Sequence, residues 1–202
     1  MLYQPEDVFY RRAKKEGYRS RAAYKLIELN RRFHLIRPGD RVVDLGAAPG
    51  GWLQVASRLV GKEGRVIGLD IQPIEAFEEE NIFLLQGDIS SEEIRRKVAE
   101  LLGAGADCVL SDLSPRLSGI RDADISRSLE LGRSALKFAS DLLKPGGNFL
   151  VKTFVGEELN LFSLELKERF RLVERTRPEA TRKGSSEIYF VARGFQKGPA
   201  QG

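Results

Sequence analysis

A glycine-rich turn between an apolar segment and a helical pattern constrains the fold of this chain more than any other feature. Val42 and Val43 precede residues 44–52, which read Asp-Leu-Gly-Ala-Ala-Pro-Gly-Gly-Trp, and apolar residues recur at helical spacing after this segment. The pattern predicts a strand, a tight turn and the start of a helix. Such a turn lets a ligand lie against bare backbone, with the N-terminus of the helix directed at it.

The composition of the turn indicates which ligand it binds. The spacing of Gly46 and Gly50, with Pro49 between them, does not fit the dinucleotide fingerprint Gly-x-Gly-x-x-Gly, so a nicotinamide dinucleotide is the weaker alternative. A carboxylate at Asp44 would repel a phosphate but would favour a ligand with a cationic amino-acid end. S-adenosylmethionine fits this description, and a purely structural turn is the other alternative. The predicted contacts with S-adenosylmethionine in this segment are Asp44, Gly46, Ala47, Pro49, Gly50, Gly51 and Trp52.

Acidic residues also end the next predicted strands. Asp70 follows an apolar segment and lies 20 residues beyond Gly50, where nucleotide-binding α/β folds place the acid that accepts hydrogen bonds from ribose hydroxyls. Asp88 ends the following strand and could accept a hydrogen bond from an adenine amino group. Asp112 ends the strand after that. Because parallel strands end at one edge of a sheet, we expect Asp70, Asp88 and Asp112 to bind the same cofactor.

Strands and helices alternate from residue 40 onwards. We expect strands at 41–45, 65–70, 82–86, 106–111, 147–154, 171–175 and 187–193, and helices near 20–35, 51–60, 91–102, 123–143 and 158–169. Ser20 is a candidate N-cap for the first helix. This order predicts an α/β fold: a doubly wound, mostly parallel seven-stranded sheet with helices on both faces, which is a Rossmann-like arrangement. The loop before the last strand is short, so at least one of the last two strands should run antiparallel.

The length and composition favour one domain in the cytoplasm. The chain has 202 residues, and no apolar run approaches the length that spans a bilayer. The N-terminus lacks the apolar region of a signal peptide, and one cysteine, Cys108, excludes an internal disulfide framework. We therefore expect a single domain over 1–202, with a basic helical extension at about 1–37 and a flexible tail at about 195–202. We expect no membrane partner, and we favour a monomer.

Positive charge is concentrated at both ends of the chain. Residues 1–37 hold ten Lys and Arg against four Asp and Glu, and residues 167–202 hold nine against four, whereas the middle of the chain is acidic. Tyrosines are interleaved with the N-terminal cations. This distribution is typical of a protein that binds a polyanion, and here it favours RNA over a merely solvated surface. The candidate RNA-binding residues are Arg11, Arg12, Lys14, Lys15, Arg19, Arg21, Arg182 and Lys183.

Several charged residues lie within or beside apolar segments. Lys152 lies inside the predicted strand 147–154, where a buried ammonium group needs a partner unless its long stem reaches solvent. The strand that ends at Asp112 should be its neighbour in a doubly wound sheet, so the two side chains can meet. Glu187 begins another apolar strand, and Lys25 lies on the boundary between the polar and apolar faces of the first helix.

Five short segments resemble one enzyme family. They are residues 20–26 (Ser-Arg-Ala-Ala-Tyr-Lys-Leu), 44–52, 111–115 (Ser-Asp-Leu-Ser-Pro), 150–154 (Leu-Val-Lys-Thr-Phe) and 185–189 (Ser-Ser-Glu-Ile-Tyr). With them, the chain from about residue 10 to 194 resembles the FtsJ/RrmJ family of RNA ribose 2′-O-methyltransferases. The resemblance implies a catalytic set of Lys25, Asp112, Lys152 and Glu187, and a uridine of large-subunit ribosomal RNA as the target. Residues 114–119 depart from the pattern of the bacterial branch, which bears on the substrate rather than on the reaction.

The chemistry implied by this resemblance needs neither a metal nor a covalent intermediate, because the methyl group of a sulfonium is already activated. Lys152 could take the proton of the 2′-hydroxyl, or it could orient that hydroxyl and stabilise the developing charge. His34, the only histidine, excludes histidine triads and histidine-rich metal sites, and we expect it to pack against or cap a helix end. A methyltransferase acting on tRNA or an mRNA cap, and a catalytically silent RNA-binding protein with the same fold, are the alternatives.

Overall fold

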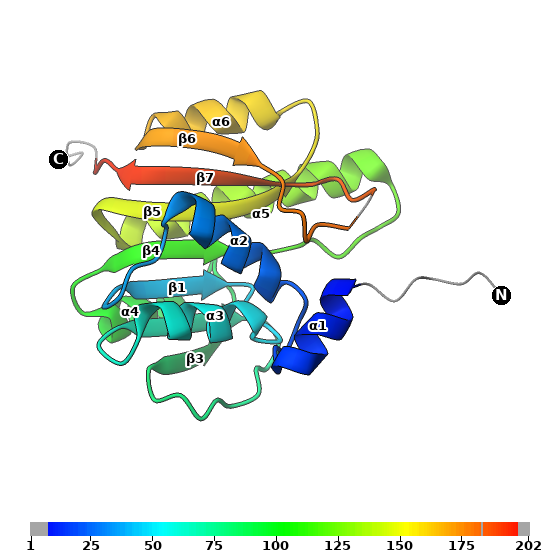
Figure 1. Ribbon diagram of the computed structural model, residues 1–202. Coiled ribbons are helices and arrows are strands. Elements are labelled where there is room, and N and C mark those ends of the chain that lie inside the picture. The colour runs from blue at the N-terminus through cyan, green and yellow to red at the C-terminus, as the bar shows by residue number, and fades with distance from the viewer. Residues whose placement is uncertain (1–7, 183, 198–202) are drawn as a thin grey trace.

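The computed structural model describes residues 8–182 and 184–197 and contains one seven-stranded sheet (Figure 1). The strand order is β3-β2-β1-β4-β5-β7-β6. The first five strands in this order are parallel to one another, and β7 is antiparallel to both β5 and β6. The strands are β1 Arg41–Leu45, β2 Arg65–Asp70, β3 Ile82–Gln86, β4 Ala106–Ser111, β5 Leu143–Phe154, β6 Phe170–Thr176 and β7 Glu187–Phe195. The predicted doubly wound fold is confirmed, including the antiparallel strand near the C-terminus.

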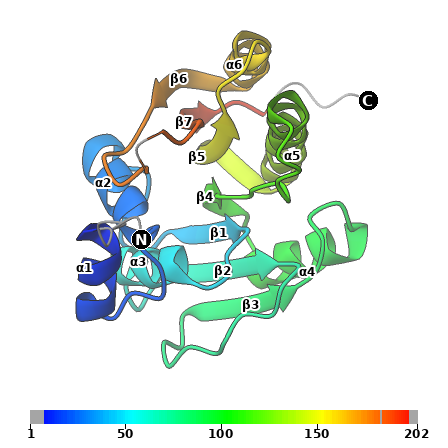
Figure 2. The ribbon, with the colours of Figure 1, turned by 90° about the vertical axis from the view of Figure 1, so that its right-hand side faces the viewer.

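Helices cover both faces of this sheet (Figure 2). They are α1 Val8–Glu16, α2 Ala23–Phe33, α3 Gly51–Val60, α4 Glu92–Leu102, α5 Arg121–Leu142 and α6 Leu159–Lys167. One apolar core lies between the sheet and α2 with α3, and a second lies between the sheet and α4, α5 and α6. In the part of the chain that the structure describes, no helix has the length and apolar character that a membrane crossing requires.

The side chains of each strand alternate between these two cores. In β5, Leu150 belongs to the core under α2 and α3, whereas Val151 belongs to the core under α5. In β7, Tyr189 and Phe190 divide in the same way. Because the side-chain period of a strand is two, Lys152 must lie on the same face as Leu150, which is the face covered by α2.

The structure corrects one expectation about helix ends, for Ser20, and decides between the two alternatives for His34. The first helix begins at Ala23, its N-cap Ala22 makes no side-chain cap hydrogen bond, and Ser20 is therefore not the cap. Ser20 instead places its hydroxyl against Gly51 at the start of α3. His34 is exposed, has a φ of 52°, and donates its backbone N–H to Asn30 at 2.8 Å, so it caps the helix and does not pack.

The fifth strand begins earlier than expected. Residues 144–147, which read Lys-Pro-Gly-Gly, belong to β5 and do not form a separate turn before it. The register with β4 shifts there, because Ala106 pairs with Leu143 while Cys108 already pairs with Asn148. This irregularity absorbs the proline and glycines at the amino end of the strand, away from the edge where the parallel strands end.

Candidate active site

Six polar residues share one face and one edge of the sheet. Asp44, Asp70 and Asp112 lie at the carboxyl ends of β1, β2 and β4, and Lys152 lies near the carboxyl end of β5. Each of these four residues lies two or four positions after a member of the α2–α3 core in the corresponding strand. Because side chains alternate between the two faces of a strand, all four lie on the face that α2 and α3 cover. Glu187 and Tyr189, at the start of the antiparallel β7, reach the same place. The sheet therefore gathers these side chains beneath α2 and the turn before α3.

Lys152 and Asp112 are in direct contact. The Nζ of Lys152 donates to the backbone carbonyl of Asp112 at 2.8 Å and lies 3.0 Å from its Oδ1. Lys152 is only 5% exposed, so its stem does not reach solvent, and the partner that a buried ammonium requires is supplied by the neighbouring strand. Ser111 pairs with Val151 in the β4–β5 register, which places the two residues that follow side by side.

Lys25 and Glu187 form a second pair at this site. The Nζ of Lys25 lies 2.7 Å from the Oε2 of Glu187, and both residues are largely covered. Lys25 comes from α2 and Glu187 from the first position of β7, so the pair joins the helix to the sheet. The four residues of the expected catalytic set are thus brought together, although they lie far apart in the sequence.

Tyr189 links the two pairs, and the sequence reasoning missed it. Its hydroxyl donates to Asp112 Oδ1 at 2.8 Å and accepts from Lys25 Nζ at 3.2 Å. The side chain is fully buried, and burial together with Asp112 and Glu187 holds the pKa of Tyr189 well above its usual value, so the phenol stays protonated. One sequence signal could have found it: Tyr189 lies two residues after Glu187, so the two side chains share a face of the strand. Its pairing with Lys152 across β5 and β7 is known only from the structure.

Asp44 is an isolated carboxyl group in the interior. It is fully buried, and neither of its carboxylate oxygens has a hydrogen-bond partner among the described residues. Burial, followed by the nearby Asp112 and Asp70, raises the pKa of Asp44 well above its usual value. A buried carboxyl without a donor is costly. Three carboxylates at one edge, one of them unpartnered, fit a ligand that brings positive charge.

Asp70 fixes the shape of the glycine-rich turn. Its Oδ2 accepts from the backbone N–H of Ala48 at 2.9 Å and its Oδ1 accepts from that of Gln72 at 2.8 Å. Each carboxylate oxygen has two lone pairs, so further acceptor capacity remains for ribose hydroxyls. The turn itself needs glycine at Gly46 and Gly50, which have φ values of 78° and 110°.

Asp88 and Trp52, two further residues expected to contact the cofactor, lie in different surroundings. Asp88 follows β3, is exposed, and accepts from the N–H and the hydroxyl of Ser90, both at 2.8 Å, which lowers the pKa of Asp88. Trp52 is buried and donates its indole N–H to the carbonyl of Ala22 at 2.8 Å. The Trp52 side chain thus joins α3 to the segment before α2, and the Trp52 backbone belongs to the first turn of α3.

The segment that departs from the family pattern is anchored at the start of α5. Asp124 accepts from the backbone N–H groups of Ser118 and Gly119 at 2.8 and 3.2 Å and from the hydroxyl of Ser118 at 2.7 Å. Leu113, the residue immediately before this segment, contacts Gly46 so closely that a Cβ on Gly46 would lie 2.9 Å from the Leu113 side chain. The segment therefore adjoins the glycine-rich turn.

Both basic ends of the chain meet beside the lysine pairs. Arg11, Arg12, Lys14 and Lys15 are exposed on α1, which lies toward the edge where the parallel strands end (Figure 1). Ala180, between β6 and β7, packs with Ala13 and Tyr24, and Arg21 donates to its carbonyl. Burial and then the charge of Arg182 lower the pKa of Arg21. Lys183 lies outside the described residues.

Arg19 lies apart from this basic surface. Its guanidinium contacts the segment between β2 and β3, beside the glycine-rich turn.

Among residues 8–182 and 184–197, no three His, Cys, Asp or Glu side chains are gathered so that they could hold a metal ion.

The sequence matches one protein family over most of its length. Residues 18–195 match the family model described as FtsJ-like methyltransferase. A protein of Methanothrix thermoacetophila named ribosomal RNA large subunit methyltransferase E is 50% identical over 201 residues, which cover 100% of this chain and 77% of that protein. A protein of the same name from Archaeoglobus fulgidus is 49% identical over 192 residues, covering 95% of this chain and 97% of that one.

Solved structures share the architecture. A crystal structure of a proposed ribosomal RNA methyltransferase from Plasmodium falciparum superposes with a TM-score of 0.80 at 32% identity, covering 88% of this chain and 98% of that one. Aeropyrum pernix fibrillarin, solved with natively bound S-adenosyl-L-methionine, superposes with a TM-score of 0.57 at 20% identity, covering 87% and 75% of the two chains. The second likeness concerns the fold alone.

Proposed function

This chain belongs to the FtsJ-like methyltransferase family, and we propose that it transfers a methyl group from S-adenosylmethionine to a ribose 2′-hydroxyl of large-subunit ribosomal RNA, with a uridine as the target. The name shared by its relatives supports ribosomal RNA as the substrate. The observation that carries the proposal is the continuous network Glu187–Lys25–Tyr189–Asp112–Lys152, which lies at the same sheet edge as the unpartnered Asp44. We further propose that the chain acts as a monomer in the cytoplasm.

The residues around the turn fit S-adenosylmethionine as the methyl donor. Asp44 offers an unpartnered carboxyl to its cationic end, and Asp70 and Asp88 offer acceptors to its ribose and adenine. The backbone of the turn, at Gly46, Ala47, Pro49, Gly50, Gly51 and Trp52, would lie along it. When bound, it supplies a methyl group that is already activated for transfer to an aligned oxygen.

Lys152 is the residue that we place at the 2′-hydroxyl. An ammonium group has three N–H donors, and two of those on Lys152 are directed to Asp112. The third position on Nζ faces the 2′-oxygen. Once the proton at this position has passed to solvent, the Nζ lone pair takes the proton of the 2′-hydroxyl as the oxygen becomes bonded to carbon. Asp112 fixes Nζ through the rigid strand β4, and Tyr189 fixes Asp112 in turn. Lys25, held by Glu187, reaches the ribose or its phosphate.

Tyr189→Phe should slow methyl transfer about tenfold with little change in cofactor or RNA affinity. The substitution removes one buried hydrogen bond to Asp112 and one acceptor for Lys25, a loss in the range of about 1–3 kcal/mol, and tenfold in rate corresponds to about 1.4 kcal/mol. The measurement is the single-turnover rate at saturating cofactor. Tyr24→Phe is the matched control, because the Tyr24 hydroxyl also bonds to a carboxylate, Glu16 at 3.0 Å, outside the network. An unchanged rate in Tyr189→Phe would show that the network does not need its phenol.

We propose that RNA binds across α1 and the β6–β7 segment. Arg11, Arg12, Lys14 and Lys15 contribute from the helix, and Arg21, Arg182 and Lys183 lie in the segments that flank Lys25 and Glu187 in the sequence. These two segments pack together through Ala180, so the positive charges at the two ends of the chain form one surface beside the catalytic lysines. Phosphate contacts of this kind position RNA without reading its sequence.

Replacing Arg11, Arg12, Lys14 and Lys15 with glutamine should weaken RNA binding and flatten its dependence on salt concentration, because fewer counterions are released. Cofactor affinity should stay the same. A control with the same change in charge replaces the exposed Arg96, Lys137, Lys167 and Arg171. The measurement is RNA affinity at several salt concentrations. Equal salt slopes in the two quadruple variants would mean that the α1 cations only solvate the surface.

The test of the function is to map 2′-O-methylated nucleotides in total RNA by mass spectrometry, with and without the gene. We expect one methylated uridine of large-subunit ribosomal RNA to disappear, and the purified chain to restore it on isolated ribosomal particles. Loss of a tRNA modification instead would favour the tRNA alternative. An unchanged methylation map would favour a catalytically silent RNA-binding protein.

A further inference from the structure

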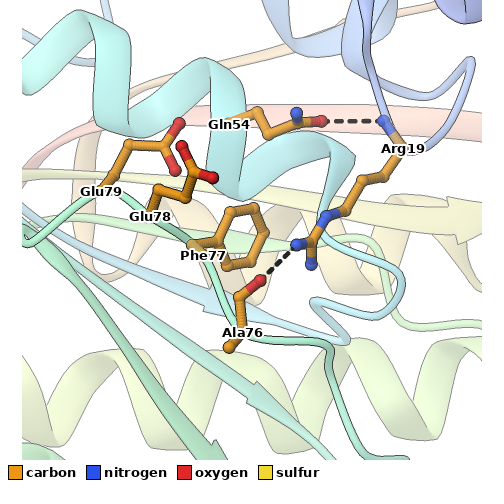
Figure 3. A pocket seen from close by; sticks show the side chains of 6 residues that line it. All are labelled: Arg19, Gln54, Ala76, Phe77, Glu78 and Glu79. Atoms are coloured by element: carbon orange, nitrogen blue, oxygen red, sulfur yellow. Dashed lines mark hydrogen bonds between the residues drawn. The ribbon is translucent and has the colours of Figure 1, made fainter.

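The Arg19 side chain contacts the segment that follows Asp70, residues 71–81, here called the latch segment (Figure 3). Its guanidinium donates to the backbone carbonyl of Glu75 at 2.7 Å. It also donates to that of Ala76 at 2.6 Å, a bond drawn in Figure 3. The guanidinium carbon also lies 3.6 Å from the centroid of the Phe77 ring. Two hydrogen bonds and a cation–π contact are a use of arginine that lysine cannot reproduce.

The backbone around Arg19 is attached to α3. The N–H of Arg19 donates to the side-chain oxygen of Gln54 at 2.8 Å (Figure 3). The Gln54 amide donates to the carbonyl of Gly17 at 2.9 Å. The position of Arg19 is therefore set by the helix that begins at the glycine-rich turn. The side chain then bridges from that helix to the latch segment.

Arg19 and Phe77 also close against the turn itself. A Cβ at Gly50 would lie 2.5 Å from Phe77 Cζ and 3.2 Å from Arg19 Cδ, so both side chains pack on the bare backbone of this residue. The Arg19 guanidinium also lies 3.4 Å from the carbonyl oxygen of Pro49. At the other end of the latch segment, Asp70 holds Ala48. The turn and the latch segment are thus joined at two points, one of which depends on Arg19.

The charges around Arg19 disfavour an RNA phosphate there. The shallow hollow beside it has a volume of about 520 Å³ and is lined by Arg19, Gln54, Ala76, Phe77, Glu78 and Glu79. Glu75 and Glu80 flank the same stretch of chain. A phosphate approaching the guanidinium would meet several carboxylates, whereas the cations of α1 are exposed on a basic helix.

We propose that Arg19 is a positioning residue of the cofactor site, which latches residues 71–81 onto the glycine-rich turn, and that it is not an RNA contact. The inference rests on the proposed function in taking S-adenosylmethionine as the ligand of the turn. The latch holds Asp70 and the backbone of Gly50 in their relative positions, so part of the cost of ordering the site is met before the ligand arrives. The charge pattern of the sequence predicts that Arg19 contacts RNA, whereas its contacts in the folded chain favour a role at the site of the methyl donor.

Arg19→Ala should weaken S-adenosylmethionine binding about tenfold, a change of about 1.4 kcal/mol, and leave RNA affinity and its salt slope unchanged. Calorimetry without RNA measures the first, and RNA titrations at several salt concentrations measure the second. Arg96→Ala, at an exposed position on α4, is the control. Unchanged cofactor affinity, or a reduced salt slope for RNA, would overturn the inference. Wild-type protein that binds the cofactor but methylates no RNA would contradict the proposed function and leave the latch standing.

A second measurement reads the latch without any ligand. A glutamate-specific protease should cut the Arg19→Ala protein within residues 75–80 at least fivefold faster than the wild type, because closure by Arg19 and Phe77 is lost. Phe77→Leu, which keeps an apolar side chain but removes the ring, should give the same change in both assays, and it serves if Arg19→Ala fails to fold. Equal cleavage rates in the wild type and the variant would show that Arg19 does not close this segment.

Discussion

Lys152→Ala is expected to abolish methyl transfer while the cofactor and RNA still bind. The Nζ of Lys152 is held by two contacts with Asp112, and in the proposed function it faces the 2′-hydroxyl. A residue that acts only in the transition state affects the rate and not the affinity for the ground state. Arginine should not rescue the variant, because a guanidinium keeps its proton near neutral pH and its planar fork does not fit a point contact.

The measurement for Lys152 is single-turnover transfer of a labelled methyl group at saturating cofactor. The same strand supplies a matched control: Lys144 lies at the other end of β5 and pairs with Asp107 at 2.7 Å, so Lys144→Ala removes a similar ion pair away from the site. We expect Asp112→Ala to resemble Lys152→Ala, and Lys25→Ala and Glu187→Ala to have smaller effects. If Lys152→Ala retains more than about a tenth of the wild-type rate, a difference of roughly 1.4 kcal/mol in the barrier, then the lysine is structural.

Asp44→Asn is expected to stabilise the ligand-free protein and to weaken S-adenosylmethionine binding about thirtyfold or more. Loss of one partner of a buried charge pair costs about 2–5 kcal/mol, and 2 kcal/mol is roughly thirtyfold in affinity. Burial raises the pKa of Asp44 above its usual value of 3.8, so the folded state binds this proton more tightly than the unfolded state. The contribution of Asp44 to the free energy of unfolding therefore falls as the pH rises from about 3.8 through the raised pKa.

The affinity for S-adenosylmethionine should change with pH in the opposite direction to the contribution of Asp44 to stability. A cationic ligand beside Asp44 favours the ionised carboxylate, so binding should release a proton and the affinity should increase with pH across the same window. Thermal unfolding at two pH values, with and without S-adenosylmethionine, measures both effects. Asp40→Asn is the control, because burial also raises the pKa of Asp40, at the opposite edge of the sheet. A variant of Asp44 that binds the cofactor normally would separate this carboxyl from the ligand.

The sheet and its carboxyl edge could be predicted because they depend on local patterns. Apolar runs of strand length alternate with helical patterns, and this order alone places Asp44, Asp70 and Asp112 at one edge. The pairing of Lys152 with Asp112 followed from the expected neighbourhood of two strands. These inferences need no knowledge of side-chain packing, so the sequence carries them.

Other parts of the site depend on contacts that no local pattern records. Arg19 has the sequence context of an RNA-binding residue, but its partners, Glu75 and Ala76, lie in an irregular segment more than 50 positions away. Trp52 has the context of a ligand contact, yet its indole is buried against Ala22. Tyr189 reads as an apolar strand residue until the register places it opposite Lys152. In each case the role of the residue depends on which groups, distant in the sequence, it contacts in the folded chain.

The position of β7 between β5 and β6 has a consequence for how the protein assembles. In the described chain β6 pairs with β7 alone, so β6 has no place in the sheet until a strand that follows it in sequence has docked on β5. Long-range pairings of this kind are slow to form, because the chain must close large loops first. Docking of β7 also brings Tyr189 opposite Lys152 and Glu187 to Lys25. Partly folded chains that stop short of this step hold most of the parallel sheet but no complete site, so activity should emerge only with the final cooperative event of folding.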